Sequence, residues 1–151
     1  MNPSDLYHTG IVVDDVDAAR DQLTALAGYR WGPTVSADTQ VAIAGAELTL
    51  SMRLVYSADE PRLELVQTIP GTMWQPTGAG VHHIGYWSDD VDADIARLVD
   101  HGLALEAKAM SPGGSPNWAF CHGYGDTGPR IELVSRALQP MLETLFTPVD
   151  A

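Results

Sequence analysis

Apolar residues recur along this chain in two kinds of pattern, short alternating runs and longer runs with helical spacing. Residues 7–13 are rich in β-branched side chains, and an acidic turn separates them from a helical pattern that begins at Val16. β-branched runs favour strands, and apolar residues three and four apart favour one face of a helix. The helical pattern stops near Leu26, and Gly28 then suits a left-handed helix cap. The first part of the chain therefore predicts a strand followed by a helix.

Three strands are predicted after this helix, because apolar and polar residues alternate there. The first includes Val35 and residues 40–44, the second spans residues 46–56, and the third spans residues 62–67. The alternation is clearest in the second strand, where one side is formed by Leu48, Leu50, Met52 and Leu54. The predicted order of elements is thus strand, helix, strand, strand, strand.

The same order recurs in the later part of the chain. A strand is predicted over residues 81–87 and a helix over residues 91–100. Three more strands are predicted at residues 104–110, 118–122 and 130–134. After Pro140, residues 141–146 have the pattern of a short amphipathic helix.

The two halves also share residues at equivalent positions. A shift of 75 residues superposes His8 on His83 and Gly10 on Gly85, and it aligns the identical runs at 14–18 and 89–93. Each half also closes on a related segment, Pro-Arg-Leu-Glu-Leu-Val in the first and Pro-Arg-Ile-Glu-Leu-Val in the second. Repetition on this scale indicates one supersecondary unit built twice.

The duplication and the chain length together predict one α+β domain. At 151 residues the chain is long enough to bury roughly two thirds of its unfolded surface in one domain. Pro and Gly are concentrated in residues 69–80, which favours a linker over a helix or a central strand. We predict a single domain over residues 1–151, divided into repeat one at about 6–67, a linker at 68–80, repeat two at about 81–135 and a C-terminal helix at about 140–147.

The duplication places a histidine on the first strand and a glutamate on the last strand of each repeat. A carboxylate inside an apolar strand is informative, because a buried isolated carboxylate is costly unless it has a partner or a metal. His82 competes with its neighbour His83, and the alignment of the repeats favours His83. Two His and two Glu suit a divalent ion such as Ni, Co, Zn, Mn or Fe with open positions. The candidate metal ligands are His8, Glu64, His83 and Glu132.

The other histidines, the cysteine and a tryptophan are expected to have structural roles. His101 follows a predicted helix, where a cation suits the helix dipole. Cys121 and His122 lie on the strand before the last, where either could reach the pocket, and we expect packing or solvent contact for them. Trp118 follows a Pro-Gly-Gly turn in residues 111–117, and it is expected in the core, at the rim or against a substrate. The chain contains no Gly-x-Ser-x-Gly motif, no Walker phosphate loop and no dinucleotide-binding glycine motif after its first strand.

Composition narrows the choice of partners. The chain carries 20 Asp and Glu against 8 Lys and Arg, a formal net charge of -12. Nucleic acids and anionic membranes require clustered cations, so neither is expected as a partner. The single Cys121 excludes an intramolecular disulfide, and no segment is long and apolar enough to span a bilayer. We expect a cytoplasmic protein.

These features resemble the vicinal oxygen chelate superfamily, which includes glyoxalase I, methylmalonyl-CoA epimerase, extradiol dioxygenases, and fosfomycin and bleomycin resistance proteins. The resemblance rests on the paired βαβββ units, the His8 strand with its Asp-Asp-Val-Asp turn, the Val-His-His-Ile-Gly run and the closing Arg-Ile-Glu-Leu-Val. It covers residues 6 to about 135 and implies a cup-shaped mixed sheet around one metal ion. The His-Glu-His-Glu order is similar to glyoxalase I, and the sequence through the linker is similar to methylmalonyl-CoA epimerase.

The resemblance implies a metal-dependent isomerase or lyase that acts by proton transfer next to a metal-bound carbonyl. Its substrate would be a small carbonyl or thioester compound, and Glu132 and Glu64 would be the catalytic residues. Two alternatives stay open, an iron-dependent extradiol-type dioxygenase and a small-molecule binding or resistance protein without catalysis. The half-open sheets and the apolar residues 141–146 also predict a homodimer.

Overall fold

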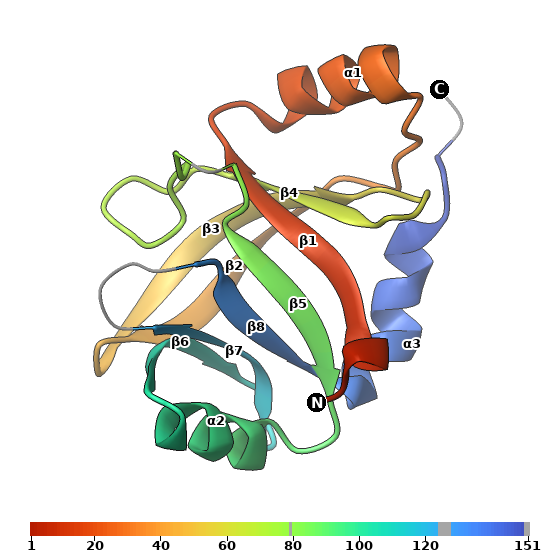
Figure 1. Cartoon of the computed structure of the whole chain (residues 1–151). Helices are drawn as coiled ribbons and strands as arrows, with labels where there is room; N and C mark the ends of the chain where they lie inside the picture. The colour runs from red at the N-terminus through yellow and green to blue at the C-terminus, as the bar shows by residue number, and fades with distance from the viewer. Residues whose placement is uncertain (79, 124–127, 150–151) are drawn as a thin grey trace. The chain divides into compact units, whose positions relative to one another are not determined.

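Two βαβββ repeats follow one another along the chain, as the sequence predicts (Figure 1). The computed structural model describes residues 1–78, 80–123 and 128–149. The first repeat consists of β1 (Leu6–Val13), α1 (Val16–Ala27), β2 (Val35–Ile43), β3 (Ala46–Tyr56) and β4 (Leu63–Gln67). The second consists of β5 (His83–Ser88), α2 (Val91–Asp100), β6 (Leu103–Met110), β7 (Pro116–Gly123) and β8 (Arg130–Ser135). The predicted α+β class is confirmed.

Both helices begin with the same cap, which explains why the acidic turn is duplicated. The Asp15 carboxylate accepts a hydrogen bond of 3.0 Å from the backbone N–H of Ala18. The Asp90 carboxylate accepts an equivalent bond of 3.0 Å from Ala93. Each aspartate therefore satisfies an amide that the first helical turn would otherwise leave unpaired. α1 ends at Gly28, whose φ of 75° is the left-handed conformation predicted for this cap.

The described chain divides into two compact units, which we name after their helices. The α1 unit contains His8–Asp38, Ser51–His82 and the C-terminal residues from Pro140 onward. The α2 unit contains Met1–Tyr7, Thr39–Leu50 and His83–Gln139.

The boundaries of the units differ from those of the repeats at residues 39–50, which come from the first repeat but belong to the α2 unit. In this segment Ala42 and Ile43 of β2 pair with Lys108 and Ala107 of β6 in antiparallel register. This pairing of β2 with β6 explains why residues 39–50 belong to the α2 unit.

In the α1 unit, β4 pairs with β1 in parallel and with β3 in antiparallel register. The register sets Gly10 of β1 opposite Glu64 of β4. α1 packs on the face of β4 that carries Leu65 (Figure 1). The buried residues of this core are Val16, Trp31, Val55 and Leu65. Because strand side chains alternate, Glu64 points away from the face that α1 covers.

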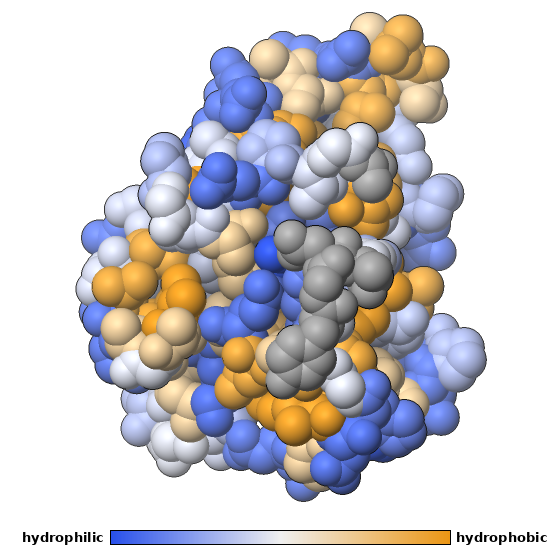
Figure 2. Space-filling view, turned by 60° about the vertical axis from the view of Figure 1, so that its left-hand side comes forward, coloured by the Kyte–Doolittle hydropathy of each residue, from blue (hydrophilic) through white to orange (hydrophobic). Residues whose placement is uncertain are grey.

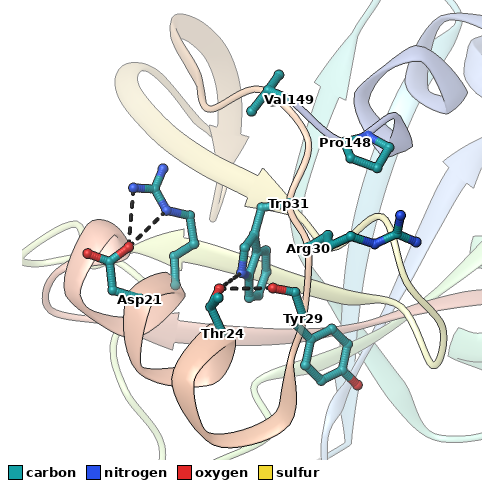
Figure 3. A pocket seen from close by; sticks show the side chains of 8 residues that line it. Asp21, Thr24, Tyr29, Arg30, Trp31, Pro148 and Val149 are labelled. Atoms are coloured by element: carbon teal, nitrogen blue, oxygen red, sulfur yellow. Dashed lines mark hydrogen bonds and ion pairs between the residues drawn. The ribbon is translucent and has the colours of Figure 1, made fainter. Parts of the chain in front are cut away.

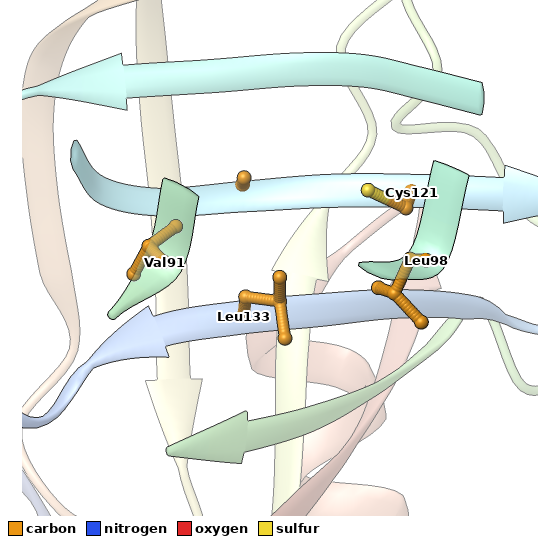
Figure 4. Close-up of a cluster of buried hydrophobic side chains, with 5 residues drawn as sticks. Val91, Leu98, Cys121 and Leu133 are labelled. Carbon is orange, nitrogen blue, oxygen red and sulfur yellow. The ribbon is translucent and has the colours of Figure 1, made fainter. Parts of the chain in front are cut away.

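The α2 unit repeats this arrangement. β8 pairs with β5 in parallel and with β7 in antiparallel register, and β7 also pairs with β6. Gly85 stands opposite Glu132, the same relation as that of Gly10 to Glu64. α2 packs on β6, β7 and β8, and the core between them contains Val91, Leu98, Ala119, Cys121 and Leu133 (Figure 4). The duplication in the sequence is thus a duplication of local sheet geometry.

Some predicted element boundaries are wrong. β2 is continuous from Val35 to Ile43 rather than interrupted. β5 begins at His83 instead of residue 81, and the preceding His82 ring nitrogen Nε2 lies 2.8 Å from the Met73 carbonyl in the linker. β7 begins at Pro116, inside the predicted turn of residues 111–117. Proline lacks an N–H group and is tolerated as the first residue of a strand.

The predicted C-terminal helix is also different in the structure. The chain forms one α-helical turn, α3 (Gln139–Leu142), and then a 3-10 turn, η3 (Glu143–Phe146). So short a segment gains little from helix propagation, so tertiary contacts decide its path. Two further 3-10 turns, η1 (Pro3–Asp5) and η2 (Arg136–Leu138), were not predicted. In the predicted linker, residue 79 lies outside the described residues.

Figure 2 shows apolar residues on one face as separate patches between polar ones. Among the large apolar residues that the structure describes, Leu26 is the most exposed, at 76%. No helix within residues 1–78, 80–123 and 128–149 is long and apolar enough to cross a membrane.

Candidate metal centre

The α1 unit contains a buried histidine and a buried glutamate on neighbouring parallel strands. His8 on β1 is 2% exposed and Glu64 on β4 is 4% exposed. Because Gly10 stands opposite Glu64, His8 lies two residues before the directly paired position and on the same face as Gly10. The His8 Nε2 and Glu64 Oε2 atoms are 3.5 Å apart.

The α2 unit contains an equivalent pair. His83 on β5 is fully buried, and Glu132 on β8 is 7% exposed. Gly85 stands opposite Glu132, so His83 has the same two-residue offset from its glutamate. The His83 Nε2 and Glu132 Oε2 atoms are 3.6 Å apart. Each unit therefore repeats the strand positions, the burial and the separation of the pair.

An aromatic ring on a third strand packs against each histidine. In the α1 unit Tyr56 makes an edge-on contact with His8, with ring centroids 5.6 Å apart, and it stands opposite Glu64 in the β3–β4 register. In the α2 unit Phe120 makes the same contact with His83 at 5.0 Å and stands opposite Glu132. Neither ring was identified from the sequence as part of a site. Their shared position, directly across from the glutamate, is the signal that identifies them.

The donor chemistry of each pair fits a divalent metal ion. Imidazole nitrogen and carboxylate oxygen both bind ions of the Zn, Co, Ni, Mn and Fe group. The separations of 3.5 and 3.6 Å exceed the roughly 2.7–2.9 Å of a direct charge-assisted hydrogen bond. They are close to the spacing of about 3.0–3.4 Å between adjacent ligands whose bonds to one ion are about 2.1 Å long. Ligand atoms suited to a metal are thus present in each unit, on His8, Glu64, His83 and Glu132.

The other histidines have local structural roles. The His82 ring is buried against the Met73 carbonyl. His101 caps the C-terminus of α2, and its Nδ1 atom lies 2.7 Å from the Arg97 carbonyl oxygen. That position matches the expectation that His101 interacts with the end of a helix.

Cys121 and His122 point to opposite faces of β7. Cys121 belongs to the core under α2, where burial raises the pKa of its thiol to about 11 (Figure 4). His122 lies on the other face, with Nε2 3.1 Å from the Gly128 carbonyl and Nδ1 3.8 Å from the Glu106 carboxylate. The expectation of packing for these two residues agrees with their burial.

A further ion pair on the α2 unit was not identified from the sequence. The Arg130 Nε atom donates to the Glu106 carboxylate at 2.6 Å. The register of β6 and β7 shifts between Leu105 and Ala107, so Glu106 is at a β-bulge. A bulge redirects a side chain in a way that strict alternation does not predict.

A cavity of about 560 Å³ lies on the α1 unit between α1, residues 29–31 and the C-terminal residues Pro148 and Val149 (Figure 3). None of the four candidate ligands lines it. Its arginines are engaged by carboxylates, since Arg20 contacts Asp21 at 3.4 Å and Arg30 contacts Asp59 at 2.5 Å. Both arginines of the cavity therefore already have a carboxylate partner.

Comparison with known proteins agrees with these features. A family model described as Glyoxalase/Bleomycin resistance protein/Dioxygenase superfamily matches residues 7–122. One similar solved structure is a Streptomyces coelicolor methylmalonyl-CoA epimerase variant in complex with 2-nitronate-propionyl-CoA. It is 25% identical in sequence, its TM-score is 0.58, and the match covers 87% of this chain and 94% of that chain. Methylmalonyl-CoA epimerase from Mycobacterium tuberculosis is 20% identical with a TM-score of 0.59, covering 92% of each chain, and this likeness concerns the fold alone. Among curated proteins, no match to this chain was found.

Proposed function

The chain belongs to the Glyoxalase/Bleomycin resistance protein/Dioxygenase superfamily, and we propose that it is a metal-dependent isomerase that moves a proton at the carbon next to a substrate carbonyl. The observation that carries this proposal is the buried His–Glu pair that occurs once in each repeat. The likeness to methylmalonyl-CoA epimerase, at 25% identity over 87% of the chain, supports an epimerase-like role. The proposed substrate is an acyl thioester with a branched carbon next to its carbonyl.

The proposed metal ligands are one His–Glu pair from each repeat. Support comes from the equal strand offsets, the nearly equal separations of 3.5 and 3.6 Å and the burial of every member. Two buried carboxylates without a cation are costly, so the set is more stable when a divalent ion is bound. The proposed ligands of a single ion are His8, Glu64, His83 and Glu132.

A divalent ion held by these four residues would act as a Lewis acid towards the substrate carbonyl. The proposed task of the protein is to hold the imidazoles in place and to move one proton. Tyr56 and Phe120 restrict the orientation of the two imidazole rings through their edge-on contacts. One of the two glutamates, Glu132 or Glu64, remains a ligand while the other is released from the ion to act as the base. The released carboxylate accepts the proton from the carbon next to the carbonyl and returns a proton to that carbon, so no atoms or electrons are gained or lost overall.

Solvent-deuterium exchange tests the proposed reaction. The metal-loaded protein is incubated in deuterated water with a 2-methyl-branched acyl thioester or with a 2-oxoaldehyde hemithioacetal, and deuterium at the carbon next to the carbonyl is measured. Glu132→Gln keeps the side-chain shape and removes its basicity, so it should lower turnover by a factor on the order of 100 or more with little change in substrate affinity. Glu47→Gln, an exposed change on β3, is the matched control and should leave turnover unchanged.

The outcomes of this assay separate the competing functions. Exchange in either compound class supports the isomerase and identifies the substrate type. Oxygen consumption with catechols in the iron(II) protein, without exchange, would instead indicate the extradiol-type dioxygenase. Ligand binding without turnover under every metal tested would indicate a binding or resistance protein.

Metal analysis tests the proposed ligands independently of activity. We expect about one divalent ion per chain, with binding strongly weakened in His8→Ala and in His83→Ala. His101→Ala removes a histidine at the end of a helix and should keep the metal content of the parent chain. Unchanged metal content in both ligand variants would contradict the proposal.

A further inference from the structure

The C-terminal segment, residues 140–149, is held against the rest of the α1 unit by close backbone contacts. The backbone N–H of Val149 donates to the Trp31 carbonyl oxygen at 3.0 Å. At Gly32 an added Cβ atom would lie only 1.7 Å from the Leu145 carbonyl oxygen. Only glycine permits so close an approach, so position 32 is adapted to this segment. Figure 3 shows that Pro148, Val149 and Trp31 line the same cavity.

In this segment the ring of Phe146 contacts two other residues of the α1 unit, Tyr56 and Arg62. Phe146 contacts Tyr56 edge-on, with ring centroids 5.3 Å apart. The Arg62 guanidinium carbon lies 3.9 Å from the centroid of the Phe146 ring, within the range of a cation–π contact. Arg62 is held in turn by the Ser57 carbonyl, which accepts a 2.8 Å hydrogen bond from Nη1. Phe146 therefore contacts both Tyr56 and Arg62, and the Arg62 side chain is itself held by a hydrogen bond.

Tyr56 connects Phe146 to both members of the His–Glu pair. Its ring contacts the His8 imidazole edge-on at 5.6 Å, and its backbone stands opposite Glu64 in the β3–β4 register. Arg62 lies two residues before Glu64, immediately before β4 begins at Leu63. A shift of the Tyr56 ring would thus alter the packing of His8.

The second repeat has an equivalent support that comes from its own strand. Phe120 contacts His83 as Tyr56 contacts His8, and Phe120 is itself contacted edge-on by Trp118 at 5.5 Å. Trp118 lies two residues before Phe120 on β7. The corresponding residue of the first repeat, two before Tyr56 on β3, is Leu54. The first repeat has no aromatic side chain at this position, and Phe146 supplies the aromatic contact to Tyr56 instead.

We infer that Phe146 is a positioning residue for the His8–Glu64 pair and that it acts through Tyr56. The C-terminal segment provides to the first repeat the aromatic support that Trp118 provides to the second. This inference deepens the proposed function, because a fixed His8 ring is what a metal site in this position requires. Residues that orient metal ligands without touching the metal typically contribute a factor of about 10–100 to metal affinity.

Cobalt(II) affinity and the His8 ring signal of the metal-free protein test this inference together. Phe146→Ala should weaken cobalt(II) binding by roughly 10-fold, the lower end of the effect of removing a group that directly orients a metal ligand. In the metal-free protein it should also remove the nuclear Overhauser contact between the His8 and Tyr56 rings. Phe146→Tyr retains the ring and should restore both readouts. Leu142→Ala, an apolar truncation in the same segment that removes no aromatic ring, controls for general loss of stability. It should change neither readout once the change in its melting temperature has been taken into account.

The two readouts separate failure of this inference from failure of the proposed function. A parent chain that binds no cobalt(II) would refute the metal site, while the His8–Tyr56 ring contact would still test the positioning role. If Phe146→Ala keeps both the parent affinity and the ring contact, the inference is overturned. It is also overturned if Leu142→Ala reduces both readouts as much as Phe146→Ala, because the effect would then be one of stability alone.

Discussion

Leu65→Ala and Leu133→Ala remove the same side chain from equivalent positions of the two repeats. Each leucine follows the glutamate of its repeat, and each is fully buried. Leu65 belongs to the core of the α1 unit and Leu133 to the core of the α2 unit. The pair therefore tests whether the two cores contribute to one cooperative domain.

The expected magnitude follows from complete burial. A buried Leu→Ala change costs about 2–5 kcal/mol in free energy of unfolding, because apolar surface is lost and a cavity is left behind. Both side chains are packed between a sheet and a helix, so we expect about 3 kcal/mol for each. For a protein of this size about 1 kcal/mol corresponds to about 2–4 °C, so the melting temperature should fall by about 6–12 °C. Leu26→Ala, at a residue that is 76% exposed, is the matched control and should change stability by less than about 0.5 kcal/mol.

Calorimetry and urea unfolding, followed by circular dichroism and by tryptophan fluorescence, measure the effect. In a single cooperative domain both variants lower the midpoint of one shared transition. Two separate transitions, each lowered by only one of the variants, would contradict the single-domain prediction. An unchanged midpoint in either variant would refute the packing argument for that core.

Three further predictions concern a thiol, a backbone contact and assembly. Burial raises the pKa of the Cys121 thiol from 9.0 to about 11, so the native protein should resist alkylation at pH 8 and react once unfolded. The stability linked to this raised pKa is fully present below pH 9 and is lost as pH rises through about 11, which urea titrations across that range will measure. Gly32→Ala should detach residues 143–149 and speed their amide hydrogen exchange, whereas Gly113→Ala, where an added Cβ meets only ordinary contacts, should not. The chain should sediment at micromolar concentration with twice its 16.2 kDa mass, and a monomeric mass would rule out the homodimer.

The sequence by itself determined the features that depend on short-range patterns. Alternating and helical periods predicted both βαβββ repeats and the start of each helix after its acidic turn. The repeat alignment selected His8, Glu64, His83 and Glu132, and the structure places each of them on the predicted strand, buried, beside the other member of its pair. These results follow because strand geometry assigns each residue to a face from its position alone.

Tertiary structure decided the features that depend on contacts between distant segments. The pairing of β2 with β6 assigned residues 39–50 to the α2 unit, and a bulge turned Glu106 towards Arg130. The contact of Phe146 with Tyr56 joins residues separated by most of the chain, and it depends on a backbone approach that only Gly32 permits. The pattern of apolar and polar residues within one segment does not predict such contacts. Their free energy comes from burying the surfaces of two distant segments against each other.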